Sequence, residues 1–206
     1  MMAQTMLYSS RIMRATYLLP FLCLVLASVS SLAYEIDRQV IVSVPDQKLA
    51  VIENGSTIAQ YSVSTSKYGI GDRSGSYATP VGEMQIAAKI GEGAPLGTVF
   101  KNRRPTGEIL KPNAAGRDPI VTRILWLRGL EACNDHAFSR NIYIHGTPVE
   151  RMIGRPASYG CIRMRSRDVV QVFNMVPVGT KIAVVNEPIH RAMANMVGNR
   201  AHLAAN

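Results

Sequence analysis

Cys161 and His145 are the two side chains whose types and spacing best suit nucleophilic chemistry. Cys161 lies in the segment SYGCIRM, and His145 lies sixteen residues earlier in IHGT. A thiol with a pKa near 8.5 is mostly protonated at neutral pH, and a nearby histidine or positive charge raises its thiolate fraction. We therefore expect Cys161 to be the nucleophile and His145 the base that activates it.

The residues around this pair also suit acyl transfer. Gly160 leaves space beside the thiol, and the main-chain N–H groups near Cys161 are candidates for an oxyanion hole. Gly146 allows a tight turn after the histidine, and Arg163 is close enough in sequence to bind a substrate carboxylate. The expected chemistry is attack on an amide carbonyl, formation of a thioester, and release to an amine or to water.

Other roles for the cysteine remain open at this stage. An exported chain favours disulfides, so a bridge between Cys133 and Cys161 is the main structural alternative. A metal site is a weaker one, because the cysteines and the four scattered histidines form no C-x-x-C or H-x-x-x-H arrangement. The run Cys133–His136 offers ligand atoms, but neighbouring loop residues rarely converge on one ion. We expect no metal and no cofactor.

Residues 1–33 predict a secretory signal peptide. Two arginines precede a short apolar stretch at residues 18–29, and Ser31-Leu32-Ala33 forms a small-x-small cleavage site. An uncleaved anchor is the alternative, but the apolar stretch is shorter than the roughly 20 residues of a membrane span. We expect a mature chain that begins at Tyr34, is exported to the periplasm or cell envelope, and has no stable membrane insertion.

The charge of the predicted mature chain limits the kinds of binding partner that suit it. It would have 206 − 33 = 173 residues, enough for one domain with a sizeable core, and loss of two arginines lowers the formal charge from +9 to +7. A basic exported protein suits an anionic partner such as a cell-wall polymer. Nucleic acid fits poorly, because the cationic residues are scattered and not interleaved with aromatic ones.

Alternating apolar residues predict strands in the first part of the mature chain. In residues 39–66 apolar and polar residues alternate, and Asn54-Gly55 is a strong hairpin signal because both positions tolerate positive φ. We expect Ile58 to belong to the buried face of this hairpin. Further strands are expected at Glu83–Ala88, Ile120–Leu127, Asn141–Ile144 and Lys181–Val185.

One helix is expected after the cysteine. Ser166 is its predicted N-cap, Asp168 lies in its first turn, and Pro177 and Gly179 end it. Residues 100–119 predict a long loop, of the kind that often lines a site. Residues 187–206 predict a frayed helix or a disordered tail.

Several of these segments resemble the catalytic domain of the YkuD-type L,D-transpeptidases. IHGT followed by SYGCIRM is similar to the family signature, usually H-G-x with S-H-G-C-I/V-R-M. ATPVGEMQI, VPVGTKIAVV and the opening hairpins also resemble family segments, so the likeness covers about residues 40–185. It implies a mainly β, sandwich-like catalytic domain over residues 34–186, with one short helix after the cysteine, that acts on peptidoglycan stem peptides.

The resemblance also implies residue roles. The family's nucleophile falls on Cys161 and its base on His145, which is oriented by the main chain near Gly146. Arg163 would bind a stem-peptide carboxylate. The remaining motif positions fall on Ser158 and Gly160, which we expect at the substrate.

Tyr159 departs from the pattern, because the family usually has a second histidine there. That histidine is not the base, so we expect Tyr159 to donate a hydrogen bond or to pack against substrate. The departure puts the rate and the preferred acceptor in question.

The resulting prediction is an exported L,D-transpeptidase that cross-links peptidoglycan. The same site used with water would make an L,D-carboxypeptidase or an amidase that releases a wall-attached protein. A sortase-like transpeptidase is disfavoured by the compact motif around Cys161. A non-catalytic cell-wall-binding protein with a decayed site is the alternative from another class.

Overall fold

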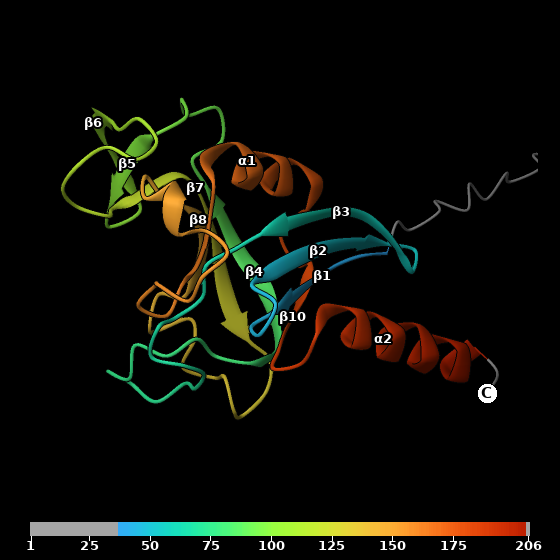
Figure 1. Ribbon diagram of the computed structural model, residues 1–206. Coiled ribbons are helices and arrows are strands. Elements are labelled where there is room, and N and C mark those ends of the chain that lie inside the picture. Colours follow the sequence, from blue (N-terminus) through green and yellow to red (C-terminus); the bar gives the residue numbers. More distant parts are fainter. Residues whose placement is uncertain (1–36, 205–206) are drawn as a thin grey trace, which may run out of the picture. The chain divides into compact units, whose positions relative to one another are not determined.

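The computed structural model describes residues 37–204, which form ten strands, two α-helices and one short 3-10 helix (Figure 1). The predicted signal peptide at residues 1–33 lies outside the described residues. No helix within residues 37–204 is long and apolar enough to cross a membrane. The strands are β1 (Arg38–Ser43), β2 (Lys48–Glu53), β3 (Ser56–Ser62), β4 (Gly82–Ile90), β5 (Thr98–Lys101), β6 (Arg104–Ile109), β7 (Ile120–Gly129), β8 (Tyr143–Gly146), β9 (Ile162–Met164) and β10 (Lys181–Val185).

These strands form one mixed sheet, which confirms the predicted mainly β class. The main order is β3-β2-β1-β10-β4-β7-β5-β6, and β8 joins it between β7 and β9. Two neighbouring pairs are parallel, β1 with β10 and β8 with β9. The second of these pairs carries the two candidate catalytic residues on adjacent segments.

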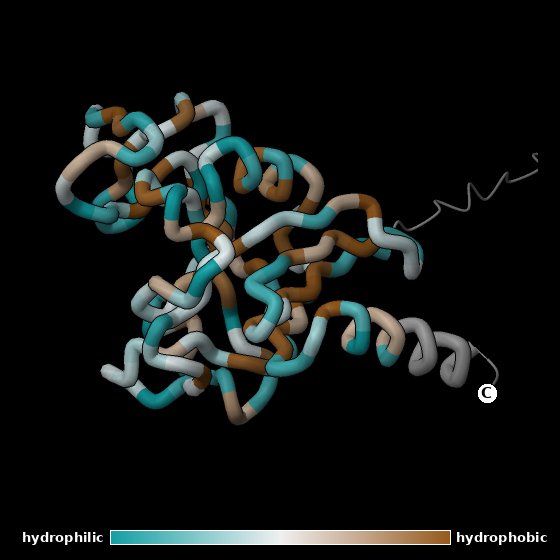
Figure 2. The backbone as a smooth tube through the Cα atoms, in the orientation of Figure 1, coloured by the Kyte–Doolittle hydropathy of each residue, from teal (hydrophilic) through white to brown (hydrophobic). Residues whose placement is uncertain are grey.

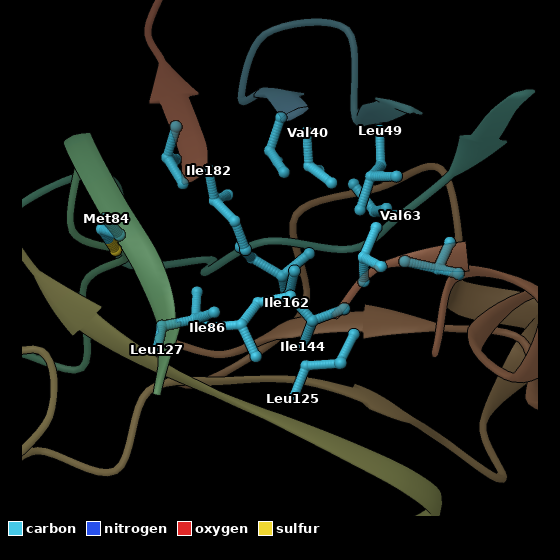
Figure 3. Packing of buried hydrophobic residues seen from close by; sticks show 14 of the residues in the cluster. Val40, Leu49, Val63, Met84, Ile86, Leu125, Leu127, Ile144, Ile162 and Ile182 are labelled. Atoms are coloured by element: carbon cyan, nitrogen blue, oxygen red, sulfur yellow. The ribbon is translucent and has the colours of Figure 1, made fainter. Parts of the chain in front are cut away.

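The sheet folds over a large apolar core, which gives the domain its sandwich-like section. Inward residues of β1 and β2 pack against those of β7, β8 and β9, as Figure 3 shows for Leu49, Ile144 and Ile162. Alternate residues of each strand point to opposite faces, so the other face of β1 is free to pack elsewhere. The core therefore fixes which face of β8 and β9 is left for the site.

The Asn54-Gly55 hairpin is confirmed, but one of its residues was misplaced. Both turn residues have positive φ, at 51° and 84°, as a tight hairpin requires. The ladder of β2 and β3 shifts register, with Val51 opposite Ala59 and Ile52 opposite Thr57. Ile58 is the extra residue of this bulge and is exposed, so its predicted place on the buried face is wrong.

Helix α1 (Ser166–Met175) follows β9, as expected, and buries Val169, Val172 and Phe173. Figure 2 shows hydrophilic and hydrophobic positions mixed along this helix, as expected for a helix with one buried face. The predicted cap is wrong by one residue. Arg165 is the N-cap and makes no side-chain capping hydrogen bond. Ser166 is the first residue of the helix, and its N–H donates to the side chain of Glu150, which lies in the 3-10 helix Glu150–Met152.

One further expectation needs correction, and the structure decides between two alternatives for another segment. The predicted loop at residues 100–119 contains a hairpin, because β5 and β6 pair there. Of the two alternatives for residues 187–206, the structure shows the helix, α2 (Ile189–Ala204), whose residues Ile189 and Ala192 pack on the outer face of β1 and β2. The spacing of these apolar residues places them on one face of a helix, a signal that is short and easily missed. The two helices thus lie on opposite faces of β1 and β2 (Figure 1).

Candidate active site

The parallel pair β8 and β9 brings the predicted base and nucleophile to the same face. Ile144 lies opposite Ile162, and both side chains point into the core. Side chains alternate along each strand, so His145 and Arg163, which lie opposite each other, point to the other face. Cys161, the residue before β9, packs against Ile124, which lies opposite His145, and therefore lies on the same face. The parallel pairing of β8 and β9 thus brings together a cysteine and a histidine that are sixteen residues apart in the sequence.

His145 is almost fully buried, with 5% of its surface exposed, and its orientation is set by the main chain. Its Nδ1 lies 2.8 Å from the Gly146 carbonyl oxygen. Since a carbonyl can only accept, Nδ1 carries the proton and Nε2 keeps its lone pair. Burial lowers the pKa of His145 to about 4, against the opposing effect of this hydrogen bond. The imidazole is therefore neutral, with Nε2 free to accept a proton.

A bulge in β7 leaves room for this arrangement. Val121 lies opposite Gly146 and Ile124 opposite His145, so two residues of β7 are skipped. One of them, Thr122, has a φ of 72°, which is unusual for a β-branched residue. A Cβ on Gly146 would lie 2.6 Å from the Val121 carbonyl oxygen, so only glycine fits beside the bulge.

The strained threonine is held by buried hydrogen bonds. Thr122 Oγ1 accepts from the Gly97 N–H at 2.9 Å and donates to Ser166 Oγ at 2.8 Å. These bonds tie the bulge to the β5 side of the sheet and to the start of α1. Backbone strain of this kind persists only where the surrounding contacts support it.

The Cys161 thiol is partly exposed and rests on an apolar patch. It packs against the cluster of Phe100, Ile124 and Tyr143, and its Sγ lies 3.5 Å from the Asn141 carbonyl oxygen. Burial raises the pKa of Cys161 to about 11, although the Tyr143 N–H and the nearby arginines lower it. The expected rise in thiolate fraction is therefore not found in the resting site, because desolvation outweighs the positive charges.

Cys161 and Cys133 are both free thiols in the structure. Cys133 is exposed and lies near Glu131, whose Oε2 is 3.4 Å from the sulfur. The disulfide alternative therefore has no support from the geometry. The two cysteines belong to different surroundings, one on the apolar patch and the other beside a carboxylate.

Ser158 and Gly160 shape the turn before the cysteine. The Ser158 hydroxyl is buried, accepts from the Gly160 N–H and donates to the Cys161 carbonyl at 2.6 Å. Gly160 has a φ of 120°, in the region that favours glycine. Both residues support the Cys161 backbone; Ser158 directs its hydroxyl to the protein rather than outward to a substrate.

Arg163 also differs from the expectation. Its guanidinium is buried, forms an ion pair with Asp118 and donates to Ser64 Oγ at 3.0 Å. Asp118 raises and Arg163 lowers the pKa of His145, so the two charges of the pair act on the imidazole in opposite directions. An arginine neutralised in this way has little charge left for a substrate carboxylate. Asp118 lay in the predicted loop, and no sequence pattern marked it.

Within residues 37–204, candidate metal-ligand atoms meet at one place, away from Cys161 and His145. Side-chain atoms of Asp72, Asp135 and His136 lie within 4.8 Å of one another. The prediction that neighbouring loop residues would not converge missed Asp72, which arrives from a distant segment. Arg140 Nη1 lies 2.7 Å from Asp72 Oδ1, so an arginine already neutralises the buried carboxylate of this group. This reduces the negative charge that would attract a cation.

Tyr159 belongs to an aromatic group that the sequence did not reveal. Tyr68, Tyr77 and Tyr159 form three ring contacts with centroids 5.6 to 6.0 Å apart. Tyr77 and Tyr159 also line a cavity of about 230 Å³ together with Cys161. Tyr68 and Tyr77 lie in a glycine-rich segment far from the signature, where isolated tyrosines carry no recognisable motif.

A buried neutral imidazole and a thiol on one face of a β domain define a candidate cysteine acyltransferase site. The chain matches the model of the YkuD family, the L,D-transpeptidase catalytic domain, over residues 37–184. It is 30% identical over 152 residues to YqjB of Bacillus subtilis (strain 168), which is provisionally named an L,D-transpeptidase, and the match covers 73% of each chain. This protein therefore belongs to the YkuD L,D-transpeptidase catalytic-domain family.

Other relatives share less of their length with the chain. YkuD of Bacillus licheniformis, also provisionally named an L,D-transpeptidase, is 46% identical over 79 residues, which cover 38% of this chain and 48% of that one. The solved L,D-transpeptidase 3 from Mycobacterium tuberculosis is 17% identical with a TM-score of 0.49, covering 73% of this chain and 62% of that chain. The chain thus spans less than two thirds of these two proteins.

Proposed function

We propose that this protein is an exported L,D-transpeptidase that cross-links peptidoglycan stem peptides through a thioester on Cys161. The observation that carries the proposal is the neutral His145, with Nε2 free, on the strand beside the cysteine and on the same face. The positive net charge of the chain suits binding to an anionic wall polymer outside the cytoplasm. Export rests on the predicted signal peptide at residues 1–33, with the catalytic domain over residues 34–186.

The first half-reaction needs one proton transfer to the base. Cys161 Sγ attacks the carbonyl carbon of the third residue of a stem tetrapeptide, and its proton passes to His145 Nε2. Main-chain N–H groups beside the cysteine stabilise the oxyanion that forms. The carbon–nitrogen bond then breaks, the leaving nitrogen takes the proton from His145, and the terminal D-amino acid departs. The thioester holds the acyl group.

The second half-reaction reverses these roles. An amine of a neighbouring stem attacks the thioester carbon and gives a proton to His145. The carbon–sulfur bond breaks, and the sulfur of Cys161 regains its proton from the imidazole. Both half-reactions start from neutral groups, which agrees with the raised pKa of Cys161 and the lowered pKa of His145. Water in place of the amine would give a carboxypeptidase.

The test is incubation of the mature chain with purified stem tetrapeptides, with and without an amine acceptor, followed by mass spectrometry. A cross-linked dimer with loss of one D-amino acid is the expected product. A trimmed tripeptide as the only product would show that the protein is a hydrolase rather than a transpeptidase. No product from wild type, under conditions in which its Cys161 thiol still reacts with an alkylating reagent, would favour a wall-binding protein.

A further inference from the structure

Lys67, Tyr68, Tyr77 and Tyr159 form a connected group on the rim of the site, here called the tyrosine–lysine cluster. Lys67 Nζ donates to the Tyr159 hydroxyl at 3.1 Å and lies 4.4 Å from the centre of the Tyr159 ring. It also lies 5.2 Å from the centre of the Tyr68 ring. The cation is therefore held over two aromatic faces, an attractive arrangement for a charged ammonium group.

The cluster is attached directly to the segment that carries the nucleophile. The Lys67 N–H donates to the Ser158 carbonyl at 3.2 Å, and the Thr79 hydroxyl donates to the Gly160 carbonyl at 2.9 Å. Both ends of the segment that carries Tyr68 and Tyr77 are thus fixed beside Cys161. The cluster cannot move far from the thiol without breaking these bonds.

The rings of the cluster are open to solvent. The exposed fractions are 51% for Tyr68, 56% for Tyr77 and 60% for Tyr159. Exposed apolar patches on soluble proteins commonly mark binding sites. Tyr77 also has a φ of 55°, a conformation that non-glycine residues rarely adopt and that is frequent at functional sites. The cavity shared by Tyr77, Tyr159 and Cys161 makes the patch continuous with the reacting atom.

Charge then selects the kind of ligand. Arg163 is paired with Asp118, and Arg140 is paired with Asp72 and donates to the Ala78 carbonyl. Lys67 forms no ion pair with a carboxylate within residues 37–204. Its hydrogen bond to Tyr159 raises its pKa, so the ammonium form is favoured. Of these three cations, Lys67 is the one without an acidic partner.

We propose that the tyrosine–lysine cluster binds the donor peptide, with Lys67 pairing with a peptide carboxylate and the tyrosine rings packing on the peptide's apolar surface. This inference rests on the proposed function and assigns to Lys67 the carboxylate-binding role expected of Arg163, whose guanidinium is paired with Asp118. The carboxylate is either the terminal one, which leaves with the D-amino acid, or one on a side chain of the retained part. Both sources present the same group to Lys67.

The experiment compares wild type with Lys67→Met, which removes the charge and keeps an apolar side chain over the rings. Lys67→Arg restores a cation, and Lys181→Met removes an exposed lysine from β10 as the matched control. The donors are a stem tetrapeptide, the same peptide with an amidated C-terminus, and one with its side-chain carboxylates amidated. Initial rates give kcat and KM for each pair.

We expect Lys67→Met to raise KM for the unmodified donor about three- to tenfold, with kcat changed less than about twofold, because a charge-assisted contact at an exposed site is weakened by solvent and salt. Lys67→Arg should restore most of the loss, and Lys181→Met should match wild type. The amidated donor that abolishes the difference between wild type and Lys67→Met identifies the carboxylate.

Two results would overturn the inference in distinguishable ways. If wild type turns over the unmodified donor but Lys67→Met has the same KM, the cluster does not bind its carboxylate. The same conclusion follows if neither amidated donor reduces the difference between the two proteins. If wild type turns over none of the three donors while its thiol remains reactive, the proposed function itself fails and the inference fails with it.

Discussion

The floor of the candidate site, around His145, is buried and densely hydrogen-bonded, whereas its rim, around Tyr159, is exposed and lightly bonded. On the floor, Nδ1 of His145 donates a hydrogen bond to the Gly146 carbonyl oxygen, and Arg163 forms an ion pair with Asp118. On the rim, three tyrosine rings and Lys67 contact one another, and more than half of the surface of each tyrosine is exposed. Cys161 lies between them.

This difference separates two tasks that a transferase must combine. Proton transfer needs one fixed tautomer and a fixed nitrogen, and buried hydrogen bonds supply both. Recognition of a flexible peptide needs open surface with a few directed polar groups. Substitutions on the floor should therefore affect the chemical step and the stability, and substitutions on the rim should affect substrate affinity.

The largest effect is expected at the residue between the two regions. Cys161→Ala should reduce turnover to background while leaving the fold intact, because alanine fits the space and removes only the nucleophile. A carbapenem-type β-lactam, whose strained amide mimics the donor carbonyl, should add its mass to wild type. Intact-mass spectrometry should show no adduct on Cys161→Ala.

Cys133→Ala is the matched control, because that thiol is also free but lies beside Glu131 rather than on the apolar patch. It should keep both turnover and the β-lactam adduct. An adduct that disappears with Cys133→Ala and persists in Cys161→Ala would reverse the assignment of the nucleophile.

Loss of the base is expected to rank second. His145→Ala should lower kcat by about 10²- to 10⁴-fold, the usual contribution of general acid–base catalysis. Because the pKa of His145 is lowered to about 4 and that of Cys161 raised to about 11, kcat/KM of wild type should be nearly flat from pH 6 to pH 9. Steady-state rates with one donor across this range measure both effects. A steep fall between pH 7 and pH 6 would show an imidazole with an ordinary pKa.

The ion pair on the floor should affect stability more than recognition. Arg163→Met leaves the Asp118 carboxylate without its cation, which costs about 3–5 kcal/mol for a buried pair and less here because Asp118 is partly exposed. Urea unfolding measures the loss. The double variant Arg163→Met/Asp118→Leu should regain part of it. If Arg163→Met instead unfolds like wild type and raises the donor KM, Arg163 would bind the substrate after all.

Protonation of the floor should destabilise the fold in mild acid. The pKa of His145 is lowered in the folded state, so the unfolded chain binds the proton more readily between pH 6.5 and about 4. The free energy of unfolding should fall by about 2 kcal/mol from pH 7 to pH 5 through this residue, at 1.36 kcal/mol for each pKa unit. In His145→Gln the loss of unfolding free energy between pH 7 and pH 5 should be smaller by that amount, as urea titrations at both pH values would show. Equal slopes would mean that the imidazole titrates alike in both states.

The smallest effect is expected on the rim. Tyr159→Phe removes the hydroxyl that accepts from Lys67 and keeps the ring, so it should cost about 0.5–1.5 kcal/mol in kcat/KM. Tyr159→His should remain active and shift the balance between amine and water as acceptor. Rates with and without an amine acceptor test both variants. A Tyr159→Phe protein as inactive as His145→Ala would place Tyr159 among the catalytic residues.

Local patterns predicted much of this molecule because their causes are local. The Asn54-Gly55 turn follows from two positions that must have positive φ, and β10 coincides with its predicted bounds because a short apolar run follows Pro177 and Gly179. The pairing of Cys161 with His145 was expected from motif spacing. The β5–β6 hairpin was missed because β5 is only four residues long and the mostly exposed residues of β6 carry no alternating apolar pattern.

The sequence by itself determined the mainly β class, the family and the two residues expected to do the chemistry, because these depend on residue types at short spacing. Only the tertiary structure decided how those residues are tuned. Burial makes the resting thiol and imidazole neutral, and Asp118 forms an ion pair with Arg163. It also decided that Lys67 and the three tyrosines form the rim, since residues ninety-two positions apart meet there. Desolvation and charge pairing depend on which distant side chains come together, and sequence spacing does not carry that information.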